Sequence, residues 1–151
     1  LTTKPIQPAS ILRLDYPREA LWDDCEKKAM VYLQDILQII AGLGILNVWL
    51  LRFQNKTTYR GGESSNMKEE FAHYGLPIWS VYVIGFLKII SAAGLLTGIF
   101  IAPLVLPSAI LLAALMLGAV SMHAKVSDPI KKSAPALCLL VMTLLIALLT
   151  V

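Results

Sequence analysis

The most constraining feature of this chain is a pair of long apolar runs with a very short connection between them. The runs extend over residues 78–97 and 103–122, and Lys88 is the one charge within them. An α-helix of about 20 residues crosses a hydrocarbon core about 30 Å thick. The two runs therefore predict a transmembrane hairpin, against which the other helices of the chain must pack.

Two further apolar runs, over residues 30–51 and 134–151, complete the pattern. Charged residues make up 15% of the chain, whereas about a quarter is typical of soluble domains, and most of them lie outside the runs. The sequence thus predicts an all-α integral membrane protein, an antiparallel bundle of four transmembrane helices. The net charge of +3 is spread along the chain, which argues against a nucleic-acid surface of clustered Lys and Arg.

Residues 1–29 are expected to form an N-terminal arm and an interfacial helix ahead of a four-helix domain, residues 30–151. Prolines in the first 20 residues favour an extended segment, and a partner surface would have to offset the entropy lost on ordering it. Trp22 and the charged residues after it suit a helix at the headgroup level. The chain begins at Leu1, which is compatible with a removed leader or with a sequence that starts after the initiator methionine.

The first loop, residues 52–76, is predicted to contain a short amphipathic helix. Asn66 is the expected N-cap because Glu69 follows three residues later, and Gly75 is the expected left-handed residue at the end. The apolar residues of this segment share one side, which favours a position on the membrane surface. They are Met67, Phe71 and Tyr74.

Lys88 is the strongest candidate for a functional residue, because it lies about 15 Å inside its span. A charge at this depth is costly unless it is paired or faces water. Counting along the first span places Gln38 within reach of the lysine and Asp35 just beyond it, and Tyr82 completes a predicted buried polar cluster. A buried pair that fixes helix packing is the preferred interpretation. The alternatives are a proton or quinone-carbonyl contact, and contact with a partner subunit or pigment.

Small residues in the spans predict close helix–helix contacts. They are Gly42, Gly85, Gly94, Gly98, Ala114 and Gly118. His123, at the end of the third run, is a candidate contact for a ligand or pigment, although packing of the helix end is the preferred interpretation. No nucleophile–base pair, phosphate loop or metal-ligand spacing occurs, so the sequence argues against a self-contained enzyme and predicts no metal site.

Several short motifs follow one another along the chain in a characteristic order. They are Ala41-Gly42, then Phe71 with Tyr74-Gly75-Leu76-Pro77-Ile78-Trp79, then Gly85-x-x-Lys88 with Ala93-Gly94-Leu95-Leu96, then Met116-Leu117-Gly118-Ala119-Val120 with His123. In this order they resemble the DoxX-like family of small four-helix membrane proteins, over roughly residues 30–151. The resemblance implies a four-span bundle and, for some members, association with membrane redox systems such as thiosulfate:quinone oxidoreductase. Ile45 and Lys88 stand where members commonly carry a Lys and a Glu.

The function that these observations favour is that of a non-catalytic accessory subunit in a larger membrane electron-transfer or photosynthetic complex. The alternative is a quinone-linked oxidoreductase subunit with a pocket around Lys88. A quinone, or pigment and lipid at the bundle surface, are the candidate ligands. The expected partners are the lipid bilayer and other membrane subunits, the latter partly through the N-terminal arm. Loop charge places loops 52–76 and 124–132 on the cytoplasm-like side of either a bacterial inner membrane or an organellar membrane.

Overall fold

The structure is a computed structural model that describes residues 18–151, and this part of the chain is helical with no strand. Its elements are α1 (Arg18–Leu46), a π-helical turn η1 (Asn47–Leu51), α2 (Met67–His73), α3 (Ile78–Gly98), a 3₁₀ turn η2 (Ala102–Leu104), α4 (Val105–Lys125) and α5 (Ile130–Thr150). Four helices are long and apolar enough to cross a membrane. The predicted all-α bundle of four transmembrane helices is therefore confirmed.

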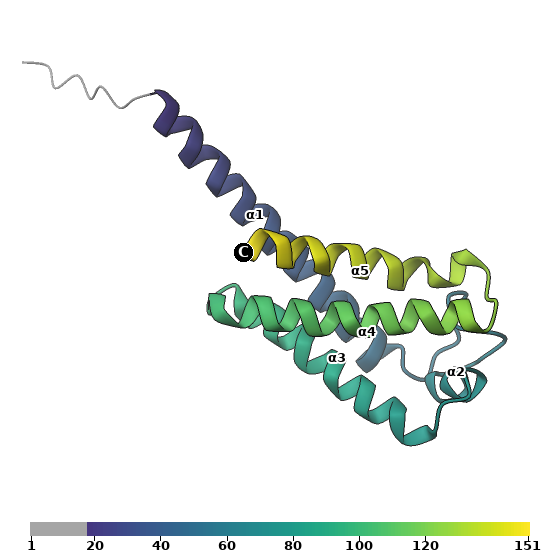
Figure 1. Ribbon diagram of the computed structural model, residues 1–151. Coiled ribbons are helices and arrows are strands. Elements are labelled where there is room, and N and C mark those ends of the chain that lie inside the picture. The colour runs from purple at the N-terminus through teal and green to yellow at the C-terminus, as the bar shows by residue number, and fades with distance from the viewer. Residues whose placement is uncertain (1–17) are drawn as a thin grey trace, which may run out of the picture.

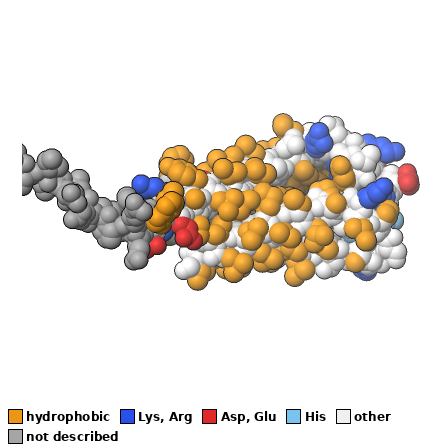
Figure 2. Space-filling model, turned by 90° about the horizontal axis from the view of Figure 1, so that it is seen from above, with side chains coloured by type: hydrophobic (Ala, Val, Ile, Leu, Met, Phe, Trp, Pro, Cys, Tyr) orange, Lys and Arg blue, Asp and Glu red, His pale blue; other side chains and the backbone are white. Residues whose placement is uncertain are grey.

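The four long helices form a square in which α1 packs against α3 and α5, and α4 packs against the same two helices (Figure 1). Gln34 near the start of α1 donates a hydrogen bond to Thr150 Oγ1 at the end of α5, at 3.1 Å. Apolar side chains cover the body of the molecule, and charged side chains gather at its two ends (Figure 2). We call the end that holds residues 52–77 and 126–129 the loop end.

Helix α1 runs without a break through the segment expected to be a separate interfacial helix. The span assigned to it, Trp22–Leu51, has 30 residues and is about 45 Å long, more than the core thickness of a bilayer. Its first turns extend beyond the other helices (Figure 1). The extended arm predicted for the first residues of the chain lies outside the described part.

Four glycines of the long helices lie where neighbouring elements approach too closely for a side chain. They are Gly42, Gly85, Gly94 and Gly98. A Cβ atom on Gly42 would lie 2.8 Å from Leu96 Cγ, and one on Gly85 would lie 2.6 Å from Trp49 Cε3. The first two glycines thus lie in the α1–α3 contact, and the other two face Ser108 and Val105 of α4. Small residues let these helices approach, as the sequence predicted.

Helix α2 has the caps that the sequence predicted, but its apolar side faces the bundle. The Asn66 side chain accepts from Glu69 N at 3.0 Å, and Gly75 has a φ of 75°, in the left-handed region that glycine adopts without strain. Met67, Phe71 and Tyr74 are buried. The Phe71 ring meets the Trp49 ring edge-on, with centroids 6.2 Å apart. The apolar side is covered by the bundle, so it does not lie on lipid.

Helix α5 begins at Ile130, four residues before the predicted start of the fourth span, and Pro135 lies inside it. Proline removes one backbone hydrogen bond, to the carbonyl four residues earlier, here that of Lys131 in the first turn. The Pro129 N-cap and the contacts of Asp128 described below fix this helix start ahead of Pro135.

Candidate functional site

A buried ion pair holds the first loop against the bundle. Arg60 Nη1 lies 3.0 Å from Glu70 Oε2, and both residues are buried. Gly61 N donates to Glu70 Oε1 at 2.9 Å. Arg60 Nε and Nη2 donate to backbone carbonyl oxygens, those of Arg52, Phe53 and Asn55, and Nη1 also donates to Met67 Sδ at 3.5 Å. A charged group taken out of water needs such complete pairing, because an unpaired buried charge is strongly destabilising.

The ion pair continues into a hydrogen-bonded network that reaches α4 and α5. Tyr74 donates its hydroxyl hydrogen to Glu70 Oε1 at 3.0 Å, and its oxygen lies 3.1 Å from His123 Nδ1. His123 Nδ1 lies 3.0 Å from Asp128 Oδ2. Asp128 Oδ1 in turn accepts from Gly62 N at 3.0 Å and lies 3.6 Å from Lys132 Nζ. The network therefore ties the first loop to the connection between α4 and α5.

The surroundings of Tyr74 keep its phenol protonated, whereas those of Asp128 keep its carboxyl group ionised. Burial, and then the negative charge of Glu70 and the hydrogen bond to it, raise the pKa of the Tyr74 phenol above its ordinary value. The phenol therefore stays protonated and can donate. Burial alone would raise the pKa of Asp128. The hydrogen bonds from Gly62 and His123 and the charge of Lys132 outweigh it, and they lower this pKa below its ordinary value.

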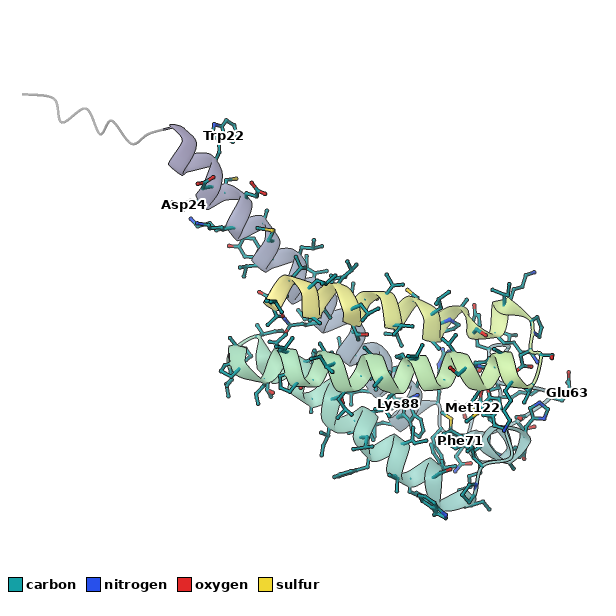
Figure 3. All side chains as sticks on the ribbon, viewed as in Figure 1. Trp22, Asp24, Glu63, Phe71, Lys88 and Met122 are labelled. Atoms are coloured by element: carbon teal, nitrogen blue, oxygen red, sulfur yellow. The ribbon has the colours of Figure 1, made fainter. Side chains whose placement is uncertain are left out.

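An apolar cavity of about 360 Å³ adjoins this network in the loop-end half of the bundle. Nine polar residues line it: Arg52, Thr57, Tyr59, Arg60, Glu70, Tyr74, Lys88, His123 and Lys132. All four long helices and η1 supply apolar walls, among them Ile45, Trp49, Ile84, Leu115, Met116, Met122 and Leu139. Figure 3 shows Lys88, Phe71 and Met122 in this half of the bundle.

Among the buried charged groups that line the cavity, Lys88 is the least compensated. Its side chain is buried, and Nζ lies 5.2 Å from the centroid of the Trp49 ring, a cation–π contact. Within residues 18–151, no carboxylate oxygen lies within 4.0 Å of this ammonium group. Lys88 and Glu70 nevertheless line the same cavity. The ammonium can therefore donate hydrogen bonds to a group that enters the cavity.

Comparison with family models identifies the relatives of the chain. A model of the DoxX-like family matches residues 56–146. The chain belongs to the DoxX-like family. The match covers α2, α3, α4, most of α5 and the loops between them, so the first span lies outside it. With four apolar spanning helices, this DoxX-like protein is a multi-pass integral membrane protein. Comparisons with curated proteins and with solved structures found no match.

The cavity of this DoxX-like protein opens toward the membrane-facing surface. Val48, Ala114 and Gly118 line the cavity and are exposed. A Cβ atom on Gly118 would meet no atom within 4 Å. Ala114 and Gly118 were predicted to mediate helix packing, but this space shows that Gly118 lies at an opening, on the same helix face as Ala114.

The cluster predicted around Lys88 does not form, because α1 and α3 pack in a different register. Gly85 lies against Trp49, and Gly98 lies near Gln38 Oε1. Lys88 therefore lies beside η1. Asp35 lies about 18 Å from that point, measured along the axis of α1. Gln38 is 1% exposed, and its Oε1 accepts no hydrogen bond from the described residues.

The prediction assumed that Leu51 and Ile78 lie at the same height, at one interface. In the structure, α3 extends about six residues, or about 9 Å, further toward the loop end than η1 does. The first loop and α2 fill the space between η1 and the loop end. Tyr82, the fourth predicted member, is 57% exposed, and its ring lies 5.6 Å from Lys68 Nζ.

Sequence reasoning found Lys88 and His123 but missed their neighbours in this DoxX-like protein. Arg60, Glu70 and Asp128 lie in polar segments between the spans and were not predicted as site residues. One signal was available, since the two loops that carry them were predicted to lie on the same side of the membrane. Opposite charges in loops that meet are candidates for pairing. His123 packs at the end of α4, which was the preferred interpretation of the sequence, and it also lines the cavity.

Proposed function

We propose that this DoxX-like protein binds a quinone-class molecule of the bilayer in the cavity beside Lys88. The observation that carries the proposal is a buried ammonium group, without an ion-pair partner within residues 18–151, in an apolar cavity with an opening on the membrane-facing surface. A quinone ring is flat and apolar and carries carbonyl oxygens at its edge. The volume of about 360 Å³ is in the range of small-molecule sites.

Each part of the cavity has a role in this proposal. Lys88 donates to a carbonyl oxygen of the ring, and this hydrogen bond replaces the water lost on burial. Trp49 and Phe71 provide aromatic walls on one side. Tyr74 and His123 present polar groups at the loop end. A bound quinone would bring two-electron redox chemistry to the site.

The test is a titration of the detergent-purified protein with a short-chain ubiquinone, followed by calorimetry. Lys88→Met keeps the length and the apolar body of the side chain but removes the donor. We expect it to weaken binding about tenfold or more, as for loss of a hydrogen bond to a charged group. Lys131→Met, at an exposed position outside the cavity, is the matched control and should bind as the wild type does. Equal binding by both variants would rule the proposal out.

A second candidate function is that of an accessory subunit in a larger membrane electron-transfer or photosynthetic assembly. The extension of α1 beyond the bundle supports it. Trp22, on the part of α1 that extends beyond the other helices (Figure 3), is 73% exposed, and Val31 is 55% exposed. Aromatic and branched apolar residues on such a segment suit contact with neighbouring membrane subunits.

The native mass of the protein, extracted from its own membrane in mild detergent, tests this second function. Stoichiometric migration with a large assembly is the expected result. Removal of residues 1–29 should then release the four-helix domain from the assembly. Migration of the wild type alone or as a small oligomer would exclude the accessory role, and it would leave the binding proposal intact.

A further inference from the structure

A second pocket, of about 380 Å³, lies in the first loop beside the cavity. We call it the outer pocket, and its lining residues are Arg52, Asn55, Lys56, Thr57, Thr58 and Tyr59. Two of these side chains are cationic, three carry hydroxyl groups, and none carries a carboxylate. The outer pocket is therefore a concave surface of positive charge with several neutral hydrogen-bond donors.

The buried Arg60 explains why the loop presents its side chains in this way. Its guanidinium binds the carbonyl oxygens of Arg52, Phe53 and Asn55, at 2.6, 3.2 and 2.9 Å. These carbonyls are consequently turned toward the interior of the loop. Their negative ends are neutralised there, while the Arg52 and Lys56 side chains remain exposed. The arrangement removes acceptors that would repel an anion.

We expect the outer pocket to lie near the lipid headgroups. Arg52 directly follows the last residue of the span Trp22–Leu51, and basic residues at this position face the phosphates of the bilayer. Arg52, Thr57 and Tyr59 also line the cavity, so the two spaces adjoin. A lipid headgroup in the outer pocket would stand beside the loop end of the cavity.

We infer that the outer pocket binds a phosphate group with a net negative charge, as carried by an anionic phospholipid or by free phosphate. The fork of the Arg52 guanidinium matches two phosphate oxygens, and Lys56 adds a point charge. The threonine hydroxyls and the Asn55 amide can donate to the remaining oxygens. This site goes beyond quinone binding and does not depend on it, because Lys88 is not part of its lining.

The experiment titrates the full chain, purified in a neutral detergent at 0.15 M salt, with short-chain phosphatidylglycerol and with phosphatidylcholine. Arg52→Gln combined with Lys56→Gln removes both charges and keeps polar side chains. At about fivefold per charge, this double variant should bind phosphatidylglycerol about 25-fold more weakly than the wild type. Lys68→Gln with Lys131→Gln removes the same charge from the loop end outside the pocket, and it should change binding less than about twofold. Thermal unfolding of each variant verifies that the fold is retained.

Inorganic phosphate distinguishes the two sources of the anion. If millimolar phosphate does not displace phosphatidylglycerol from the wild type, the ligand is the lipid headgroup. If phosphate itself binds the wild type, displaces the lipid and fails to bind the Arg52/Lys56 variant, the same site serves a soluble phosphate. Equal losses in the two double variants, or equal affinity of the wild type for the two lipids, would overturn the inference.

Discussion

The hydroxyl oxygen of Tyr74 lies 3.1 Å from His123 Nδ1, although 49 residues separate them in the sequence. Their rings meet edge-on with centroids 5.5 Å apart. Tyr74 is the C-cap of α2, a helix of seven residues, which is too short to be stable alone. The contact with His123 joins this short helix to the end of α4, and the loop end of the bundle is built around it.

Replacement of Tyr74 by Phe keeps the ring and removes the hydroxyl. Because that hydroxyl donates to the Glu70 carboxylate, we expect the free energy of unfolding to fall by about 1.5–3 kcal/mol. Equilibrium unfolding in detergent measures the change. Tyr82→Phe is the control, since the Tyr82 ring is exposed, and it should shift stability by less than about 0.5 kcal/mol. Equal shifts would mean that the Tyr74 hydroxyl contributes nothing to the fold.

Glu70→Gln removes the charge that pairs with Arg60 and nearly preserves the shape. The guanidinium stays buried without a carboxylate, so we expect a loss of about 3–5 kcal/mol in unfolding free energy. Thermal unfolding is the measurement. Glu63→Gln, at an exposed position at the tip of the loop end (Figure 3), should be nearly neutral. A stable Glu70→Gln protein would show that water reaches Arg60 freely.

Gly85→Ala and Gly118→Ala form a matched pair on neighbouring helices. The new methyl group at Gly85 would overlap the Trp49 ring, so we expect a destabilisation of about 1–3 kcal/mol. The one at Gly118 would meet no atom within 4 Å, so stability should be unchanged or slightly higher. Trp49 fluorescence should shift in the first variant alone. The opposite ranking would contradict the helix register described above.

Acidification should selectively remove the contribution of the ionised Asp128 side chain to the free energy of unfolding. Its pKa is lowered in the folded protein, so the ionised side chain stabilises the fold at pH values above its ordinary pKa of 3.8. This contribution is lost as the pH falls through the lower folded pKa. The stability difference between wild type and Asp128→Asn should therefore be constant from pH 7 to about pH 5 and shrink toward pH 3.

Unfolding midpoints across this pH range provide the measurement. Asp23→Asn, at an exposed position of α1 remote from the network, is the control. This replacement should change the free energy of unfolding by less than about 0.5 kcal/mol. A difference for Asp128→Asn that grows as the pH falls would reverse the sign and refute the account of the network.

Features that depend on contacts between residues close in the sequence were predicted correctly. Features that depend on contacts between residues far apart in the sequence were not. The ends of α2 could be predicted because Asn66 and Glu69 are three residues apart, and the cap involves no other part of the chain. The start of α5 was placed four residues too late, because the prediction took the beginning of the apolar run as the beginning of the helix. Contacts of Asp128 with Gly62, 66 residues away, stabilise the earlier start.

By itself the sequence determined the number of spans and their apolar character. These properties follow from local composition, because each span must satisfy its own backbone hydrogen bonds and match the bilayer. Only the tertiary structure decided which residues surround Lys88. That choice depends on the heights at which α1 and α3 pack, set by pairs such as Gly85 and Trp49. A shift of about six residues between α1 and α3 changes the relative height of their side chains by about 9 Å. With the predicted register Lys88 would pair with Gln38, and with the observed register it faces the cavity.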